Sequence, residues 1–150
     1  MQDLLRFFDH QECPSVDGIV YPDGSIFLLN ISIDWGRPAN YSVKKGAKTT
    51  VDGLKGEGEL YWTSCAVLVS MIDTQQSIEI WGGEASYGSD GFVSVFDLSS
   101  KNLIWIAFFN ESNPFDKLSV LDDEIYATST NGCVWKIKIK NPVDIVVECR

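Results

Sequence analysis

The stretch GFVSVFDLSSKNLIWIAFF, residues 91–109, gives the clearest structural signal in the chain. Within Phe92–Asp97, residues of similar character recur at every second position, a period that is typical of a β-strand. Turn-forming residues at Ser99–Asn102 separate this segment from the apolar run Leu103–Phe109. A strand, a short turn and a second strand in this order predict an antiparallel hairpin.

Comparable units lie on both sides of this hairpin. Asp23-Gly24 and Asn131-Gly132 are two-residue turn signals of the kind that joins paired antiparallel strands. The regular recurrence of strands and turns predicts a sandwich, a barrel or propeller-type sheets. The expected strands are 18–22, 25–33, 60–72, 77–81, 92–97, 103–109, 118–121, 124–129, 133–140 and 143–148.

Two segments depart from this pattern. Residues 2–9 are expected to form one short N-terminal helix, since Asp3 suits a helix start and apolar residues follow at spacings of three and four. Residues 34–58 are rich in glycine and lysine, and we expect a long loop there with at most one short strand. The fold class is therefore expected to be mainly β, a single-domain antiparallel sheet protein with one N-terminal helix.

The strand expected at 60–72 differs from the others in its apolar pattern. It is apolar on both faces around Cys65–Val69, whereas a half-buried strand alternates apolar and polar residues. A strand that is apolar on both faces is typical of the interior of a covered sheet. We therefore expect this strand to be central.

The net charge of the chain limits the kinds of partner that it is expected to bind. The chain has 150 residues and a formal net charge of −9, and its acids concentrate in residues 1–34 and 73–124. Such a surface repels phosphate backbones, so direct nucleic-acid binding is not expected. A basic protein partner and simple solubility both remain open as reasons for the charge.

The sequence also indicates a location. The first residues lack the basic start and apolar centre of a signal peptide. The longest apolar run, Leu103–Phe109, is far shorter than the roughly 20 residues that cross a bilayer. We expect a cytoplasmic protein that binds no membrane. Its four cysteines are too sparse for a disulfide scaffold, so they are expected to be reduced.

No residue pattern predicts a catalytic, cofactor or metal site. The sole histidine, His10, lies beside Cys13, but catalytic Cys–His pairs usually converge from distant segments, and zinc would need further ligands. Glu57 and Glu59 are a carboxylate pair of the kind used in glycoside hydrolysis, although turn positions simply solvate such charges. A hydrolase is the least favoured of three function classes, after a binding protein and a structural module that self-associates.

Residues 90–140 resemble β-propeller blades of the quinoprotein-like or WD-like kind. The resemblance rests on GFVSVFDL at 91–98, on KNLIW at 101–105 and on the hairpin around NGCVWKI at 131–137. The turn glycines Gly91 and Gly132 are 41 residues apart, which fits the period of such repeats. The resemblance implies blade-like sheets, and a closed ring would need identical chains to complete it.

Acids and aromatic rings are interleaved in the turns of the strand-rich half. Acids of this kind attract a basic partner, and rings of this kind anchor it. In size and charge, although not in any motif, the chain looks like a bacterial immunity protein that blocks a cognate basic toxin. The candidate partner-binding residues are Glu84, Tyr87, Asp90, Glu111, Phe115, Asp116, Asp122, Asp123 and Glu124.

Overall fold

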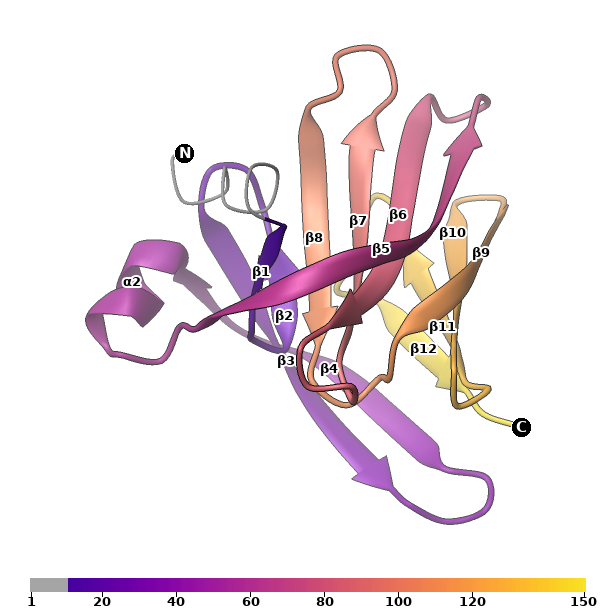
Figure 1. Ribbon diagram of the computed structural model, residues 1–150, viewed down its shortest axis with the longest axis horizontal. Coiled ribbons are helices and arrows are strands. Elements are labelled where there is room, and N and C mark those ends of the chain that lie inside the picture. Colours follow the sequence, from indigo (N-terminus) through magenta and orange to yellow (C-terminus); the bar gives the residue numbers. More distant parts are fainter. Residues whose placement is uncertain (1–10) are drawn as a thin grey trace.

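Alternating side chains and tight turns give the chain an almost entirely β architecture. The computed structural model describes residues 11–150 (Figure 1), and the helix expected at 2–9 lies outside them. The elements are β1 (Glu12–Pro14), β2 (Gly18–Val20), β3 (Ser25–Asp34), β4 (Asn40–Thr50), α2 (Val51–Gly56), β5 (Trp62–Asp73), β6 (Ile78–Ala85), β7 (Gly91–Asp97), β8 (Leu103–Phe109), β9 (Phe115–Leu121), β10 (Glu124–Ser129), β11 (Val134–Lys138) and β12 (Ile145–Glu148).

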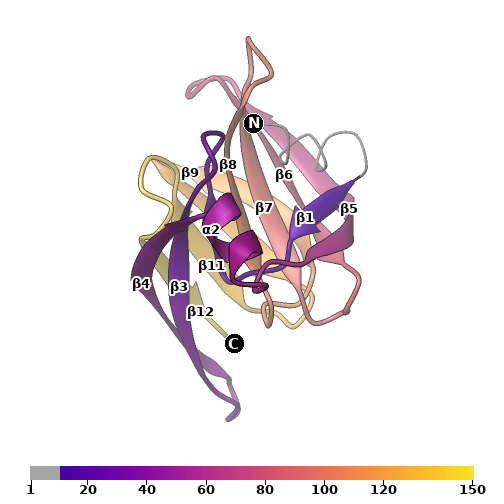
Figure 2. The ribbon, with the colours of Figure 1, turned by 90° about the vertical axis from the view of Figure 1, so that its left-hand side faces the viewer.

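The strands form two antiparallel sheets. The larger sheet has eight strands in the order β1-β5-β6-β7-β8-β2-β3-β4, and the smaller has four in the order β12-β11-β10-β9. The smaller sheet covers one face of the larger, with β9 against β5 and β6 and with β12 against β4 (Figure 1). The hairpin of β3 and β4 extends beyond the rest of the molecule (Figure 2). The expectation of a mainly β, antiparallel fold is confirmed.

A core of large rings lies between the two sheets. Trp105 and Phe109 of β8, Phe115 of β9 and Trp135 of β11 are all buried there. The ring centroids of Phe109 and Trp135 lie 4.4 Å apart. The indole Nε1–H of Trp105 donates a hydrogen bond of 2.9 Å to the carbonyl of Ile139, so this buried donor is satisfied.

A second, smaller core lies on the opposite face of the larger sheet. There β5 crosses in front of β6, β7 and β8 (Figure 1), and Cys13 of β1 packs into a cluster with Phe92 and Phe108. Helix α2 adds Val51 and Leu54 to this cluster. The helix begins at Thr50, whose side chain accepts a hydrogen bond from the amide of residue 53, as an N-cap does.

The short turns were predicted well. Gly24 lies between β2 and β3 with φ of +87°, and Gly132 lies between β10 and β11 with φ of +88°. Glycine adopts this backbone region without the steric cost that a Cβ brings. The strand pairs β7–β8 and β9–β10 also form as expected. Within β5–β8, and again within β9–β12, consecutive strands are neighbours, so each run is an antiparallel meander.

The prediction of a long loop over residues 34–58 is wrong. Residues 40–50 form the complete strand β4, paired with β3 from Asp34–Asn40 to Ser25–Thr50, and the chain then enters α2 in mid-sequence. The lysines Lys44, Lys45 and Lys48 are exposed on this strand, which lies at the edge of the sheet. An edge strand with one solvent face needs few apolar residues, and lysine on it discourages pairing with other chains.

The prediction that the strand at 60–72 lies in the centre of a sheet is also wrong. Among the strands that the structure describes, β5 is second from the edge of the sheet. Its neighbours are β6 and the three-residue β1, which pairs with residues 62–64. Val67 and Leu68 are 48% and 46% exposed. The pairing register shifts between Val67 and Val69, as at a β-bulge. The apolar run therefore reflects a strand that crosses the second core at one end and reaches solvent further on.

The expectation of four reduced cysteines is wrong for one pair. Cys133, just after the β10–β11 turn, forms a disulfide with Cys149, next to the end of the chain, while Cys13 and Cys65 are in no disulfide. Because β11 and β12 are antiparallel neighbours, they bring residues 16 apart in sequence together. Among the described residues, no helix is long and apolar enough to cross a membrane.

Candidate functional site

The structure divides the predicted partner-binding residues between two ends of the sandwich. The loop at 86–90 lies beside the loop at 110–114, since the Asn113 amide donates a 2.8 Å hydrogen bond to the Ser89 carbonyl. The turn at 122–123 lies at the other end of β9, about 20 Å away for a strand of this length. There the Gln76 side chain donates to the Asp122 carbonyl.

We call the first of these surfaces the loop end. It consists of the loops at 86–90 and 110–114 and the turn at 130–132. The Thr130 amide joins the turn to the second loop by donating a 2.9 Å hydrogen bond to the Pro114 carbonyl. Gly91 allows the second loop to lie directly on β7, because a Cβ at this position would be 2.4 Å from the Asn113 carbonyl oxygen.

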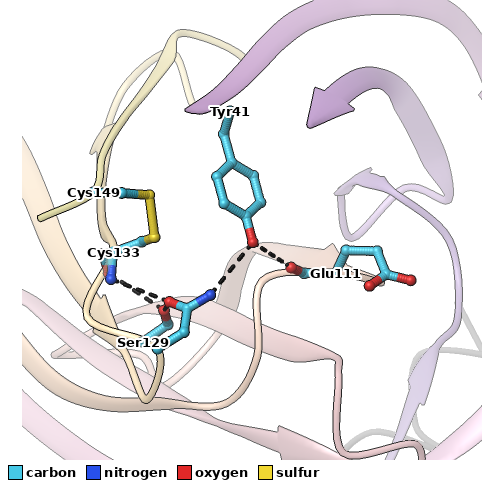
Figure 3. The surroundings of a disulfide bond; sticks show 6 residues. Tyr41, Glu111, Ser129, Cys133 and Cys149 are labelled. Carbon is cyan, nitrogen blue, oxygen red and sulfur yellow. Dashed lines mark hydrogen bonds between the residues drawn. A yellow bond between two sulfur atoms is a disulfide. The ribbon is translucent and has the colours of Figure 1, made fainter. Parts of the chain in front are cut away.

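Segments far away in the sequence hold the loop at 110–114 in place. The Asn110 amide donates a 2.7 Å hydrogen bond to Asp17 Oδ1, and the Tyr41 hydroxyl donates a 2.8 Å hydrogen bond to the Glu111 carbonyl. Figure 3 shows this hydroxyl reaching the Glu111 backbone while the Glu111 carboxylate points away from it. The loop is thus fixed through its backbone, and its acidic side chain is left available.

Tyr41 is well placed for this role. Its side chain is buried, and its ring centroid lies 5.3 Å from that of Trp135 and 5.8 Å from that of Trp35. The Asn131 amide donates a weak 3.4 Å hydrogen bond to the same hydroxyl, so two parts of the loop end meet at one oxygen (Figure 3). Burial raises the pKa of Tyr41, which keeps the hydroxyl protonated as a donor.

Carboxylates and aromatic rings are exposed around the loop end. Glu111 and Asp116 are exposed and Glu84 is partly exposed, and none of these three acids forms an ion pair with another described residue. Tyr87 is 73% exposed, and Trp35, which contacts the Tyr41 ring edge-to-face, is 63% exposed. Because no residue among 11–150 neutralises their charges through an ion pair, these acids can interact with an external cation.

Two of the predicted residues are in the interior. Phe115 is fully buried between the sheets, where its ring contacts Phe109 and Trp135. Asp90 is only 1% exposed, and no hydrogen bond of good geometry reaches its carboxylate oxygens. Burial raises the pKa of Asp90, and nearby backbone amides, that of Tyr87 among them, partly offset this effect. Neither side chain is presented to a partner in this conformation.

The acids at the other end are partly neutralised. Lys138 Nζ lies 3.7 Å from a carboxylate oxygen of Asp123 and 3.5 Å from one of Glu124. These two acids, Asp123 first, raise the pKa of Lys138. Asp122 is exposed at the turn with a φ of +57° and has no ion pair to another described residue. The loop end is therefore the better candidate for a charged interface.

The remaining chemical candidates do not assemble into a site. Among residues 11–150, no group of three or more His, Cys, Asp or Glu side chains is arranged to hold a metal ion. His10, the histidine considered for catalysis with Cys13, lies outside those residues. Glu57 and Glu59 are both exposed beside the end of α2.

Sequence patterns did not identify the residues that order the loop end. Tyr41, Trp35 and Asp17 contribute to it, although all three lie far before the loop at 110–114 in sequence. Comparisons with protein-family models, with curated proteins and with solved structures found no match to this chain. Its function is therefore argued from the loop end itself.

Proposed function

We propose that this chain is a small acidic binding protein that neutralises a basic partner, in the manner of a bacterial immunity protein. The single observation behind the proposal is an ordered acidic surface: at the loop end, Glu111 stands on a loop whose backbone is fixed by Asp17 and Tyr41. The formal net charge of −9 adds a long-range attraction for a basic surface.

The proposed mechanism is occlusion. The carboxylates of Glu84, Glu111 and Asp116 occupy a basic cleft of the partner, and the exposed rings of Trp35 and Tyr87 pack at its margins. Because the loop is already ordered, binding costs little conformational entropy. A nuclease toxin has such a cleft, since it must hold phosphate, and toxins delivered in contact-dependent growth inhibition are included in this class. The proposal involves no cofactor and no direct contact with nucleic acid.

The experiment uses the protein encoded beside this chain's gene as the partner. Both proteins are purified, and association and dissociation rates are measured at low and high salt, together with the toxic activity of the partner. The proposal expects inhibition at equal molar amounts and an association rate that falls steeply with salt. Binding without inhibition, or an association rate that does not respond to salt, contradicts it.

A cytoplasmic location belongs to the same proposal, because an immunity protein protects the cell that makes it. The Cys133–Cys149 disulfide argues against this location, since cytoplasmic proteins rarely keep such bonds. Mass spectrometry of the protein taken from its native cells, with thiols blocked at lysis, decides the point. Reduced Cys133 and Cys149 would agree with a cytoplasmic protein, and a complete disulfide would contradict it.

The second candidate function is a scaffold that self-associates through blade-like sheets. The observation that favours it is the connectivity of β5–β8 and β9–β12, each a run of four consecutive antiparallel strands. A propeller ring needs at least about four such sheets, so several chains would have to combine. Light scattering on the purified protein separates the two functions, because a monomer at high concentration excludes the ring.

A further inference from the structure

The four cysteines of the chain fall into two spatial pairs. Cys133 and Cys149 form the disulfide at the C-terminal end. Cys13 of β1 lies opposite Thr63 of β5, and Cys65 follows two positions later on the same side of that strand. The Cys65 amide also donates a 2.7 Å hydrogen bond to the Gln11 carbonyl, which keeps the two strands together beyond the last paired residues.

The side chains of Cys13 and Cys65 lie on the same face of the paired strands β1 and β5. Cys13 is part of the apolar cluster beneath these strands, and Cys65 packs against that cluster. The Cys65 thiol also lies 3.2 Å from the Gln11 carbonyl oxygen. No other described cysteine is near, so the two thiols form a separate pair.

The two thiols differ in their access to solvent. Cys13 is fully buried, whereas Cys65 is partly exposed and lines an open cavity of about 200 Å³. Burial raises the pKa of Cys13, and Cys65 and Asp90 raise it further. Cys65 is therefore the thiol that a small molecule reaches first. The cavity is lined by Ser64, Cys65, Ala66, Glu84, Ala85 and Ser86.

We propose that Cys13 and Cys65 form a dithiol site that a small disulfide oxidant converts into an intramolecular disulfide. The Cys65 thiolate attacks one sulfur of the oxidant, which forms a mixed disulfide and releases the first oxidant thiolate. The Cys13 sulfur then attacks Cys65 Sγ, which forms the protein disulfide and releases the second thiolate. The two protons of the protein thiols pass to the two released thiolates, and the two electrons reduce the oxidant to two thiols.

The new bond fastens the first strand to the body of the protein. β1 has three residues, and within the described part of the chain it pairs with β5 alone. A Cys13–Cys65 bond would fasten β1 in the way that Cys133–Cys149 fastens the C-terminal end. It would close a loop of about 50 residues, for which chain entropy raises the midpoint of thermal unfolding by about 10 °C. The stability of the protein would then depend on the redox poise of its surroundings.

The experiment treats the folded protein with oxidised glutathione and identifies the products by mass spectrometry and non-reducing peptide mapping. Wild type should become lighter by two hydrogen atoms and should yield a linked Cys13–Cys65 peptide. Cys13→Ser should stop at one glutathionyl group on Cys65, since no second thiol can displace it. Cys65→Ser should gain no adduct, because the buried Cys13 is out of reach.

The wild-type peptide map is decisive even where a variant fails to fold. Wild type that retains both thiols, or that accumulates a stable glutathionyl adduct on Cys65, overturns the proposal. A scan of thermal unfolding before and after treatment checks the consequence. The midpoint should rise by about 10 °C with the Cys13–Cys65 bond in place, and an unchanged midpoint would show that the bond does not constrain β1.

Discussion

Replacing Tyr41 with phenylalanine tests how the loop end is ordered. The change removes one hydroxyl and leaves the ring, so the contacts with Trp35 and Trp135 are retained and no large cavity forms. The change eliminates the 2.8 Å hydrogen bond to the Glu111 carbonyl and the weaker 3.4 Å one from Asn131. At the usual net value of such bonds, Tyr41→Phe should lower the free energy of unfolding by about 1–2 kcal/mol.

Urea denaturation followed by tryptophan fluorescence measures this change in the free energy of unfolding. If the slope of this free energy against urea concentration is the same in wild type and variant, the denatured state is unaffected. Tyr21→Phe is the matched control, because this half-buried tyrosine makes no hydrogen bond to another described residue through its hydroxyl, and it should change stability by less than about 0.5 kcal/mol. Hydrogen exchange should also accelerate at residues 110–114 in Tyr41→Phe alone. Equal stability losses in the two variants, or unchanged exchange in this loop, would refute the role given to Tyr41.

Four further results are expected. Glu111→Lys should slow association with the basic partner about tenfold at low salt, whereas Asp122→Lys, at the far end, should leave the rate nearly unchanged. Asp90→Asn should raise the free energy of unfolding at neutral pH, because burial raises the folded-state pKa of this carboxyl above its ordinary value of 3.8. This gain in stability should fade as the pH drops toward 3.8, and a gain that stays constant with pH in denaturation experiments would contradict burial as the cause. Gly83→Ala should prevent stable folding, judged by circular dichroism, because its Cβ would lie 2.0 Å from a backbone oxygen of β5. Cys149→Ser should lower the free energy of unfolding by about 3 kcal/mol in denaturant titrations, as expected for a disulfide that spans 16 residues, and a loss below about 1 kcal/mol would show that the bond adds little.

The parts of the fold that sequence predicted are those set by neighbouring residues. The turns at Asp23-Gly24 and Asn131-Gly132 need a positive φ that glycine supplies, so the sequence indicates them directly. The strand β4 was missed because its lysine-rich sequence has weak strand preference by itself. It becomes a strand through pairing with β3 along nearly its full length, and it needs little apolar character at the sheet edge.

The candidate site was predicted only in part, for a similar reason. Acids in turns are visible in a sequence, and Glu111 was found in this way. The Tyr41 hydroxyl that fixes its loop comes from 70 residues away. Likewise, Asp90 follows the exposed loop residue Tyr87 so closely that the sequence does not distinguish them, yet one is buried and the other exposed. Contacts that depend on the packing of two sheets leave no local pattern.

A growth-protection assay shows whether the loop end neutralises a basic toxin, as we propose. Cells that express the toxic protein encoded beside this chain's gene are supplied with wild type, with a double variant Glu111→Lys and Asp116→Lys, or with Asp122→Lys. Wild type and Asp122→Lys should restore growth, and the double variant should fail although it is folded and equally abundant. Full protection by the folded double variant would contradict the assignment of the loop end.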